Sequence, residues 1–403
     1  MSIVSSIRTG AGAAVVALLA AHPALALEAD AFAQRLTEVL KNQNFELSYE
    51  SASLEGSNVV LNGAKVAPVG VENPAEVGAL TFENVTDDGG TYTVERFGAS
   101  NVEGNFPAEG DGPAFGYSIG SWGVENMVLP PEGGGAELAT AMGGFSYDRL
   151  FIEDAAFTAD GKPFMTLASA DSTIDPNSSP LNMTGSMADL VIDLTVPPDP
   201  SGELTKWVEG TGYEKIEVDG DFAGTWDLTT GLIDVPNYAF DFANMGKLGM
   251  EMAIGGYTPA FAKSLQEVSR QTGSSDPQAQ QAAGMQMLGL VSQLSFGRFI
   301  LSFEDAGMTD RLLEYYAQTN GQTKDQLVQQ TIGILPLVLG QLQAPELQAQ
   351  IQEAVTSFLN DPKSITVSLN PDTTVAFPVL MGAAMSSPSE LAKALNAQVT
   401  ANR

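Results

Sequence analysis

The chain has 403 residues, with 49 Asp and Glu against 18 Lys and Arg, a formal net charge of −31, and no cysteine. This charge argues against nucleic acid as a partner, because a polyanion is repelled by phosphate backbones. The only histidine, His22, lies in a segment that reads as an export signal. Once this signal is removed, the chain has neither histidine nor cysteine. It then lacks the usual base at neutral pH, the thiolate nucleophile and the preferred ligands of zinc and haem iron. We therefore predict no catalytic residue, no metal site and no cofactor.

The first 26 residues have the pattern of a signal peptide. Arg8 is the only charged side chain before the apolar run 11–20, and a small-x-small triplet ends at Ala26. The run is shorter than the roughly 20 apolar residues of a membrane-spanning helix. We expect cleavage after Ala26 and a soluble periplasmic protein without an N-terminal anchor. The missing cysteines suit a bacterial periplasm better than a eukaryotic secretory route.

Residues 27–200 are expected to form an N-terminal helix followed by an antiparallel β subdomain. Residues 29–42 have apolar side chains at helical spacing, and from residue 45 the period changes to two. The prolines of segment 197–200 end any strand or helix, and we place the boundary between the two subdomains there. The strands expected before it are 46–50, 59–62, 80–83, 92–95, 117–120, 150–153, 165–168 and 190–196.

Residues 201–403 are expected to form a second β subdomain with C-terminal helices. The strands expected here are 215–220, 224–228, 238–242, 248–254, 299–303 and 365–369. The helices expected here are 204–209, 258–270, 278–294, 327–342, 347–358 and a last one from 388. The predicted fold class is α+β, with curved antiparallel β-meander sheets and a helical layer concentrated in the C-terminal third.

A short pattern, apolar-Glu-Asn/Asp-apolar, occurs at 82–85, 124–127, 152–155 and 303–306. One interpretation is a strand that bends at its solvent-facing end, where Asn and Asp tolerate the turn. The other is a duplicated strand unit whose carboxylates collect calcium. We favour the bend, because the chain has no oxygen-rich calcium loop.

Two patterns suggest hydrolytic chemistry. Residues 116–120 fit the G-x-S-x-G nucleophile elbow, but a serine without a base is a weak nucleophile, and we interpret the match as chance. Asp219, Asp221 and Asp227 surround Trp226, as in sites where carboxylates cleave glycans beside a stacking aromatic ring. The alternative for this group is a β-hairpin with acidic turns, in which Gly220 and Gly224 fit equally well.

The apolar stretch 332–339 also has two interpretations. It can be a buried helix kinked at Pro336, packed closely through Gly333 and Gly340. It can instead line a cleft for an acyl chain together with methionines, which suit adaptable apolar surfaces. The candidate ligand-binding residues are Ile334, Leu335, Leu337, Val338, Met285 and Met287.

Five segments carry a resemblance to a known family: 56–63, 255–261, 303–313, 361–364 and 399–402. Through them the chain resembles an uncharacterised family of exported alphaproteobacterial proteins. More distantly, it is similar to periplasmic proteins of the AsmA and YdgA kind, some of which are associated with the envelope and with lipid handling. The resemblance implies a strand-rich body followed by a strand and helices, without an activity that can be assigned to particular residues.

The leading hypothesis is a non-enzymatic periplasmic protein that binds a lipid or an envelope protein in an apolar groove. The alternatives are a carboxylate-based glycan hydrolase and a structural or assembly protein of the envelope. The oligomeric state is not predicted.

Overall fold

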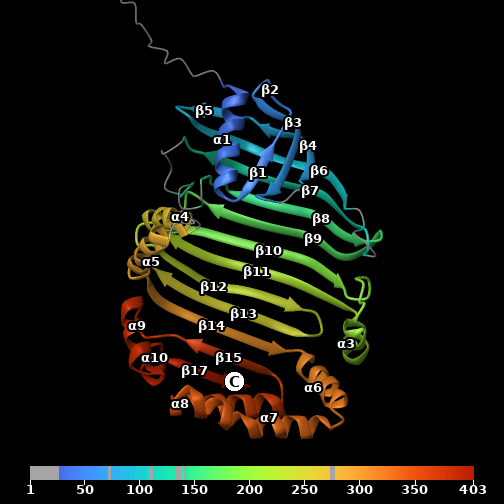
Figure 1. Ribbon diagram of the computed structural model, residues 1–403, viewed down its shortest axis with the longest axis vertical. Helices are drawn as coiled ribbons and strands as arrows, with labels where there is room; N and C mark the ends of the chain where they lie inside the picture. The colour runs from blue at the N-terminus through green and yellow to red at the C-terminus, as the bar shows by residue number, and fades with distance from the viewer. Residues whose placement is uncertain are drawn as a thin grey trace, which may run out of the picture.

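The computed structural model describes residues 27–403 except 71–73, 107, 109–111, 132–137, 140, 141, 143 and 273–276. The predicted signal peptide, residues 1–26, lies outside the described residues. The described chain forms one long antiparallel sheet with helices at its ends and along its edges (Figure 1). None of the helices in the described part combines the length and apolar character that crossing a membrane needs.

Within the described residues the sheet has 17 strands, and from β6 to β15 it is a meander in which strands that follow one another along the chain pair side by side. Its strands are β1 (Phe45–Ser48), β2 (Ser51–Glu55), β3 (Asn58–Pro68), β4 (Ala75–Glu83), β5 (Thr86–Asp88), β6 (Thr91–Phe106), β7 (Phe115–Leu129), β8 (Arg149–Ala159), β9 (Lys162–Asp175), β10 (Leu181–Asp193), β11 (Lys215–Asp227), β12 (Leu232–Phe242), β13 (Gly246–Gly255), β14 (Ser295–Asp305), β15 (Ser364–Leu369), β16 (Val375–Ala376) and β17 (Ala397–Ala401).

Most of the described helices come after β13 in the chain, in agreement with the prediction that helices are concentrated toward the C-terminus. The helices are α1 (Ala29–Asn42), α3 (Glu203–Thr211), α4 (Pro259–Thr272), α5 (Pro277–Val291), α6 (Met308–Thr319), α7 (Lys324–Leu339), the 3-10 turn η1 (Gly340–Leu342), α8 (Pro345–Asn360), α9 (Phe377–Ser386) and α10 (Pro388–Ala394). In Figure 1, α1 lies at the N-terminal end of the sheet and α7 with α8 at the C-terminal end. The predicted fold class, α+β with a curved antiparallel meander, is confirmed.

The main buried core lies between α1 and the first strands. Phe32 of α1 and Phe82 of β4 are fully buried, with their rings 4.9 Å apart in an edge-to-face arrangement. Phe82 also stacks on Phe97, and Met127 and Leu129 of β7 complete the cluster. The periodicity of residues 29–42 therefore reflects a helix that packs on the sheet, as predicted.

The strands are longer than the sequence predicts because they continue through glycines and bulges. The two strands predicted at 215–220 and 224–228 are one strand, β11, so the hairpin expected between them is wrong. A Cβ on Gly220 would lie 3.3 Å from the ring of Phe240, and one on Gly224 would lie 3.3 Å from Val235. These glycines therefore make room for side chains of the neighbouring strand. Segment 197–200 lies between β10 and β11, which pair along their lengths, and the two-subdomain division stays a prediction.

The repeated Glu-Asn/Asp pattern produces backbone bends. Asn84, Asn126 and Asp154 have positive φ of 47°, 53° and 52°, a conformation that Asn and Asp adopt more readily than other non-glycine residues. In the fourth copy, Asp305 accepts hydrogen bonds from the backbone N–H groups of Gly307 and Thr309 at the start of α6. The first and fourth copies lie where strands β4 and β14 end, as the bend interpretation predicts, whereas Asn126 and Asp154 bend the backbone inside strands β7 and β8.

Valine at position 154 is expected to lower the free energy of unfolding by about 1–2 kcal/mol, because a β-branched side chain is strained at positive φ. Glycine at the same position removes the carboxylate without strain and should stay within about 0.5 kcal/mol of the natural chain. Urea denaturation of Asp154→Val and Asp154→Gly measures the difference. Equal stability of the two variants would contradict the bend.

Candidate functional site

The residues on one face of the sheet are apolar over most of its length. Phe157 of β8 pairs with Tyr117 on β7 and with Met165 on β9, and directly paired residues of antiparallel strands point to the same face. The same register continues to β17, and we call these side chains the apolar floor. The floor includes Val102, Phe106, Phe115, Tyr117, Ile119, Ala155, Phe157, Met165, Leu167, Leu190, Ile192, Ile216, Val218, Phe222, Tyr238, Phe240, Phe242, Leu248, Met250, Phe299, Leu301, Phe303, Ile365, Val367, Leu369 and Val399.

The bends at Asn101, Asp154 and Asp189 keep the floor apolar. Each interrupts the alternation of its strand, so that Glu153 lies on the outer face while Ala155 lies on the floor. A strand without such a bend would turn its remaining apolar residues toward the outer face. The local conformation of single Asn and Asp residues therefore determines the continuity of the site.

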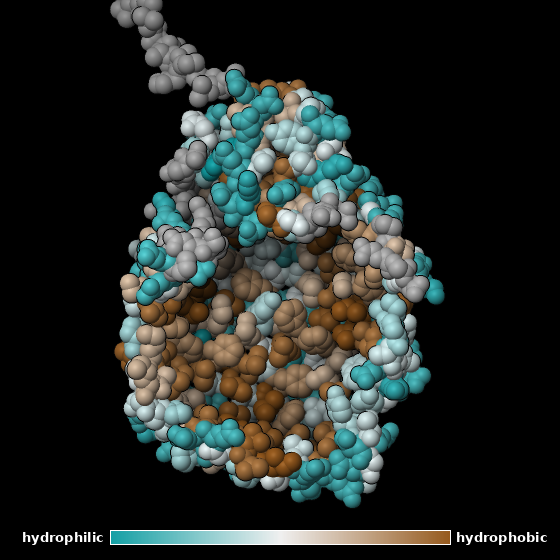
Figure 2. Space-filling model, viewed as in Figure 1, coloured by the Kyte–Doolittle hydropathy of each residue, from teal (hydrophilic) through white to brown (hydrophobic). Residues whose placement is uncertain are grey.

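The apolar floor is concave and open to solvent. Figure 2 shows the hollow, with hydrophobic side chains across its bottom and hydrophilic ones around it. Phe106, Phe115 and Phe157 are 42–44% exposed, and Leu301 and Val367 are 37% exposed. Contiguous exposure of large apolar side chains is uncommon on folded proteins and marks surfaces that bind a partner or a ligand.

Helices close the two ends of the hollow and raise its edges. The α1 core closes the N-terminal end, and Phe358 of α8 contacts Phe303 edge to face at the other end. On one edge, Ala262 of α4 packs on Leu181 and Trp226. On the other edge, α3 packs on α6. The hollow is thus a trough with one open side.

The trough is large enough for lipid chains. From β6 to β17 the pairing order passes through eleven strands, and ten spacings of about 4.8 Å give a floor about 48 Å long. One leaflet of a bilayer core is only about 15 Å thick. An extended acyl chain therefore fits along the floor with room for a second one.

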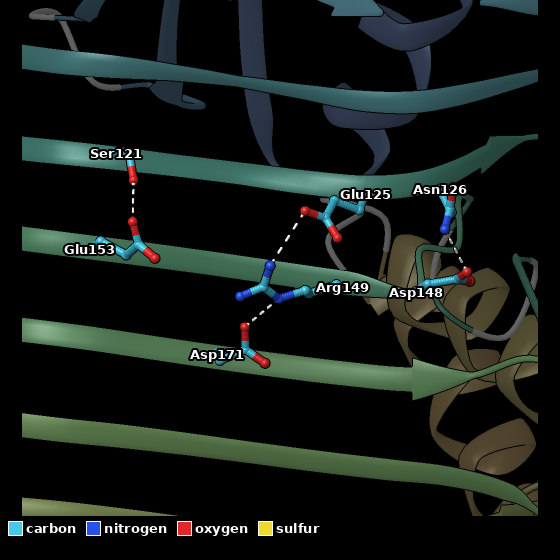
Figure 3. Close-up of polar contacts among 7 residues, drawn as sticks. All are labelled: Ser121, Glu125, Asn126, Asp148, Arg149, Glu153 and Asp171. Atoms are coloured by element: carbon cyan, nitrogen blue, oxygen red, sulfur yellow. Dashed lines mark hydrogen bonds and ion pairs between the residues drawn. The ribbon is translucent and has the colours of Figure 1, made fainter. Parts of the chain in front are cut away.

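The outer face of the same strands is polar. Arg149 of β8 forms ion pairs with Asp171 and Glu125, and Ser121 donates a hydrogen bond of 2.8 Å to Glu153 (Figure 3). The hydrogen bond with Asp171 raises the pKa of Arg149, so this guanidinium stays charged. The side chain of Arg149 also covers the ring of Phe151 at 4.8 Å. The outer face is thus built for contact with water.

The predicted ligand residues of the helix 332–339 lie on α7, at the C-terminal end. Ile334, Leu337 and Val338 are 47%, 78% and 60% exposed, and Leu335 is half-buried. A Cβ added at Gly333 or Gly340 would meet no atom within 4 Å. The alternative of a buried, closely packed helix is therefore wrong. A ligand-binding role of these four residues stays a prediction.

The two candidate methionines lie on α5. Met285 is 70% exposed, whereas Met287 packs partly into the cluster that joins α4 to α5. Their role in binding also stays a prediction. Sequence reasoning missed the floor itself, although the alternation of apolar and polar residues in β8 to β15 is its signal.

The structure separates the four residues of the candidate glycan site. Asp219 and Asp221 lie on the outer face of β11, where Asp219 accepts a hydrogen bond from the N–H of Asp189. Trp226 is buried on the other face, and its indole N–H donates to the carbonyl of Tyr257. Backbone N–H groups of Thr229 and Thr230 lower the pKa of Asp227, whereas a general acid needs a raised one. These residues do not line a common cleft.

The G-x-S-x-G match also has no catalytic geometry. Residues 116–120 lie inside β7 and not at a strand-to-helix turn. Ser118 pairs with Ala156 on the outer face. The interpretation of this match as chance is confirmed.

Two clefts lie at the C-terminal end of the sheet, and the larger of them reaches the floor residue Val399. These clefts, of about 250 and 380 Å³, follow the edge of β17 beside α8, where the N–H of Val399 donates to Gln350. Polar side chains such as Gln350, Gln398 and Lys393 line these two clefts, in contrast to the apolar floor. Among the residues that the structure describes, no three carboxylates or histidines are grouped to hold a metal ion.

These features define the protein as an open antiparallel sheet with a solvent-exposed apolar trough. Residues 239–402, from β12 to β17, match a family model described as "Uncharacterized protein", and the chain is similar to that family over this range. The match includes helices α4 to α10 and the C-terminal third of the floor. No curated protein matches the chain.

Proposed function

We propose that the protein binds lipids in the periplasm, with their acyl chains on the apolar floor. The observation that carries the proposal is the continuity of apolar side chains on one concave face, from Val102 on β6 to Val399 on β17. Acyl chains gain free energy by leaving water, at about 0.8 kcal/mol for each buried CH₂ group. The export pattern of residues 1–26 and the resemblance to envelope proteins support the compartment and the ligand class.

A lipid suits the floor better than a protein segment does. The floor side chains named above are apolar or aromatic, and the hydroxyl groups among them are those of Tyr117 and Tyr238. An extended peptide laid on this surface would leave backbone N–H and C=O groups without partners, at a cost of about 1–3 kcal/mol for each buried group. Acyl chains carry no such groups.

The proposal is tested on protein exported by a bacterial host and purified from its periplasm without detergent. Native mass spectrometry is expected to show adducts with the masses of phospholipids, and solvent extraction should release the same species. After removal of the lipid, the protein should bind a fluorescent fatty acid with a Kd below about 10 μM. Absence of both the adducts and the rebinding would end the proposal, and a co-purified peptide would favour the protein-partner alternative.

A further inference from the structure

Three segments in the C-terminal half carry no charged residue, although the chain as a whole has a net charge of −31. They are residues 277–297, 326–345 and 373–389, and each contains most or all of one helix: α5, α7 and α9. A surface helix of a globular protein normally presents charged residues to water. The absence of charge from these helices therefore needs an explanation in what they contact.

The three helices expose large apolar side chains. Met285 and Leu288 of α5 are 70% and 61% exposed, and Leu337 of α7 is 78% exposed. On α9, Val379 and Met385 are 59% and 89% exposed. A protein that keeps these side chains in water permanently would gain nothing from them, so their exposure indicates a contact surface.

Helices α5 and α9 lie along one edge of the trough, and α7 lies at the C-terminal end of the sheet (Figure 1). The N–H of Phe377, at the start of α9, donates to the carbonyl of Leu294, which follows α5. The end of α7 is tied to α8 by a hydrogen bond from Gln348 to the carbonyl of Leu339, and the beginning of α8 shares a cleft with α10. Figure 1 shows α5, α9 and α10 on one side of the sheet, continuing to α7 and α8 at its C-terminal end. We call α5, α9 and the C-terminal half of α7 the uncharged rim.

The opposite edge has the opposite character. Its helix α3 carries Glu203, Lys206 and Glu209, and α6 carries Asp310 and Glu314. Contact of that edge with an apolar phase would remove these charges from water at a high cost. The uncharged rim, in contrast, can enter an apolar phase without this cost.

We propose that the uncharged rim docks on the surface of a lipid bilayer with neutral headgroups. The charge pattern favours a bilayer over a second copy of the chain, because two such copies repel each other through their net charges of −31. It also favours neutral lipids, since the rim has no Lys or Arg to attract anionic headgroups. The hydrophobic surface of Figure 2 continues from the trough onto the end formed by α7 and α8, so the docked rim would place the trough beside the bilayer.

The test is co-sedimentation with phosphatidylcholine vesicles. Three variants, Leu288→Glu, Leu337→Glu and Met385→Glu, place one charge on each helix of the rim, at exposed positions where the fold does not depend on the side chain. The natural chain is expected to bind, each variant to bind about tenfold more weakly, and the triple variant not to bind. Gln318→Glu adds the same charge to exposed α6 on the opposite edge and should bind like the natural chain.

The outcomes separate this proposal from lipid binding on the floor. Phe157→Glu should weaken fatty-acid binding about a hundredfold and leave vesicle binding unchanged, while the rim variants should still bind a free fatty acid. The docking proposal is overturned if the natural chain does not sediment with neutral vesicles, if the rim variants sediment equally, or if binding requires phosphatidylglycerol. It is also overturned if ultracentrifugation shows a dimer that the same variants dissociate, because the rim would then be a self-contact.

Discussion

Glutamate in place of Phe157 or Leu301 is expected to weaken the binding of a fluorescent fatty acid by about a hundredfold. Both side chains lie on the apolar floor, where Phe157 of β8 is 42% exposed toward its N-terminal end and Leu301 of β14 is 37% exposed toward its C-terminal end. A carboxylate there must be desolvated by a bound acyl chain, and a charge among hydrocarbon costs about 2.5–3.5 kcal/mol. Fluorescence titration of the delipidated protein measures the change.

The matched controls are Ala156→Glu and Ser302→Glu. Each adds the same charge one residue away on the same strand, but on the outer face, where the neighbours of Ala156 are the hydroxyl residues Ser118 and Thr166. Both controls should bind the fatty acid within about threefold of the natural chain. If floor and outer-face variants lose affinity equally, the loss reflects net charge or folding, and the floor is not the binding surface.

Alanine in place of Phe82 is expected to lower the free energy of unfolding by about 3–5 kcal/mol. The ring is fully buried and contacts Phe32 of α1 and Phe97 of β6, both at 4.9 Å between ring centroids. Its removal leaves a cavity in the core that holds α1 on the sheet. Guanidinium denaturation followed by circular dichroism measures the loss.

Two further substitutions serve as references for the loss of stability expected from Phe82→Ala. Phe82→Leu retains most of the buried volume and should cost less than about 2 kcal/mol. Phe45→Ala removes a ring that is 42% exposed on β1 and should change stability by less than about 0.5 kcal/mol. A Phe82→Ala variant as stable as Phe45→Ala would show that the α1 core contributes little to the fold.

The exposed apolar floor can bind a ligand, but it also favours association between copies of the protein. Two copies that associate through their troughs bury the apolar floor, and exposed hydrophobic patches generally promote such association. The 49 acidic residues oppose this, because each copy repels the next. In this interpretation, repulsion between the acidic copies keeps the protein from associating at high protein concentration. The effect is strongest at low salt, where the charges are least screened.

The local elements of the fold were largely predictable from the chain. The helices expected at 29–42 and 347–358 follow from short-range patterns, and the structure has both, as α1 and α8. The strands were predicted too short, because Gly220, Gly224 and Asp154 resemble turn residues but lie inside strands. Helix α9 was not predicted, since the segment around Met381 is apolar all round and has no helical stripe.

The amino-acid sequence by itself determined the acidic character, the absence of thiols and the alternating pattern of the strands, because these depend only on which residues are present and on their order along the chain. Only the tertiary structure decided that the apolar residues of strands from β6 to β17 share one concave face, since this depends on register between strands and on the bends at Asn101, Asp154 and Asp189. The same holds for the apolar helix around Leu337. Its composition suits a core as well as a surface, and only the packing of the whole chain left it exposed.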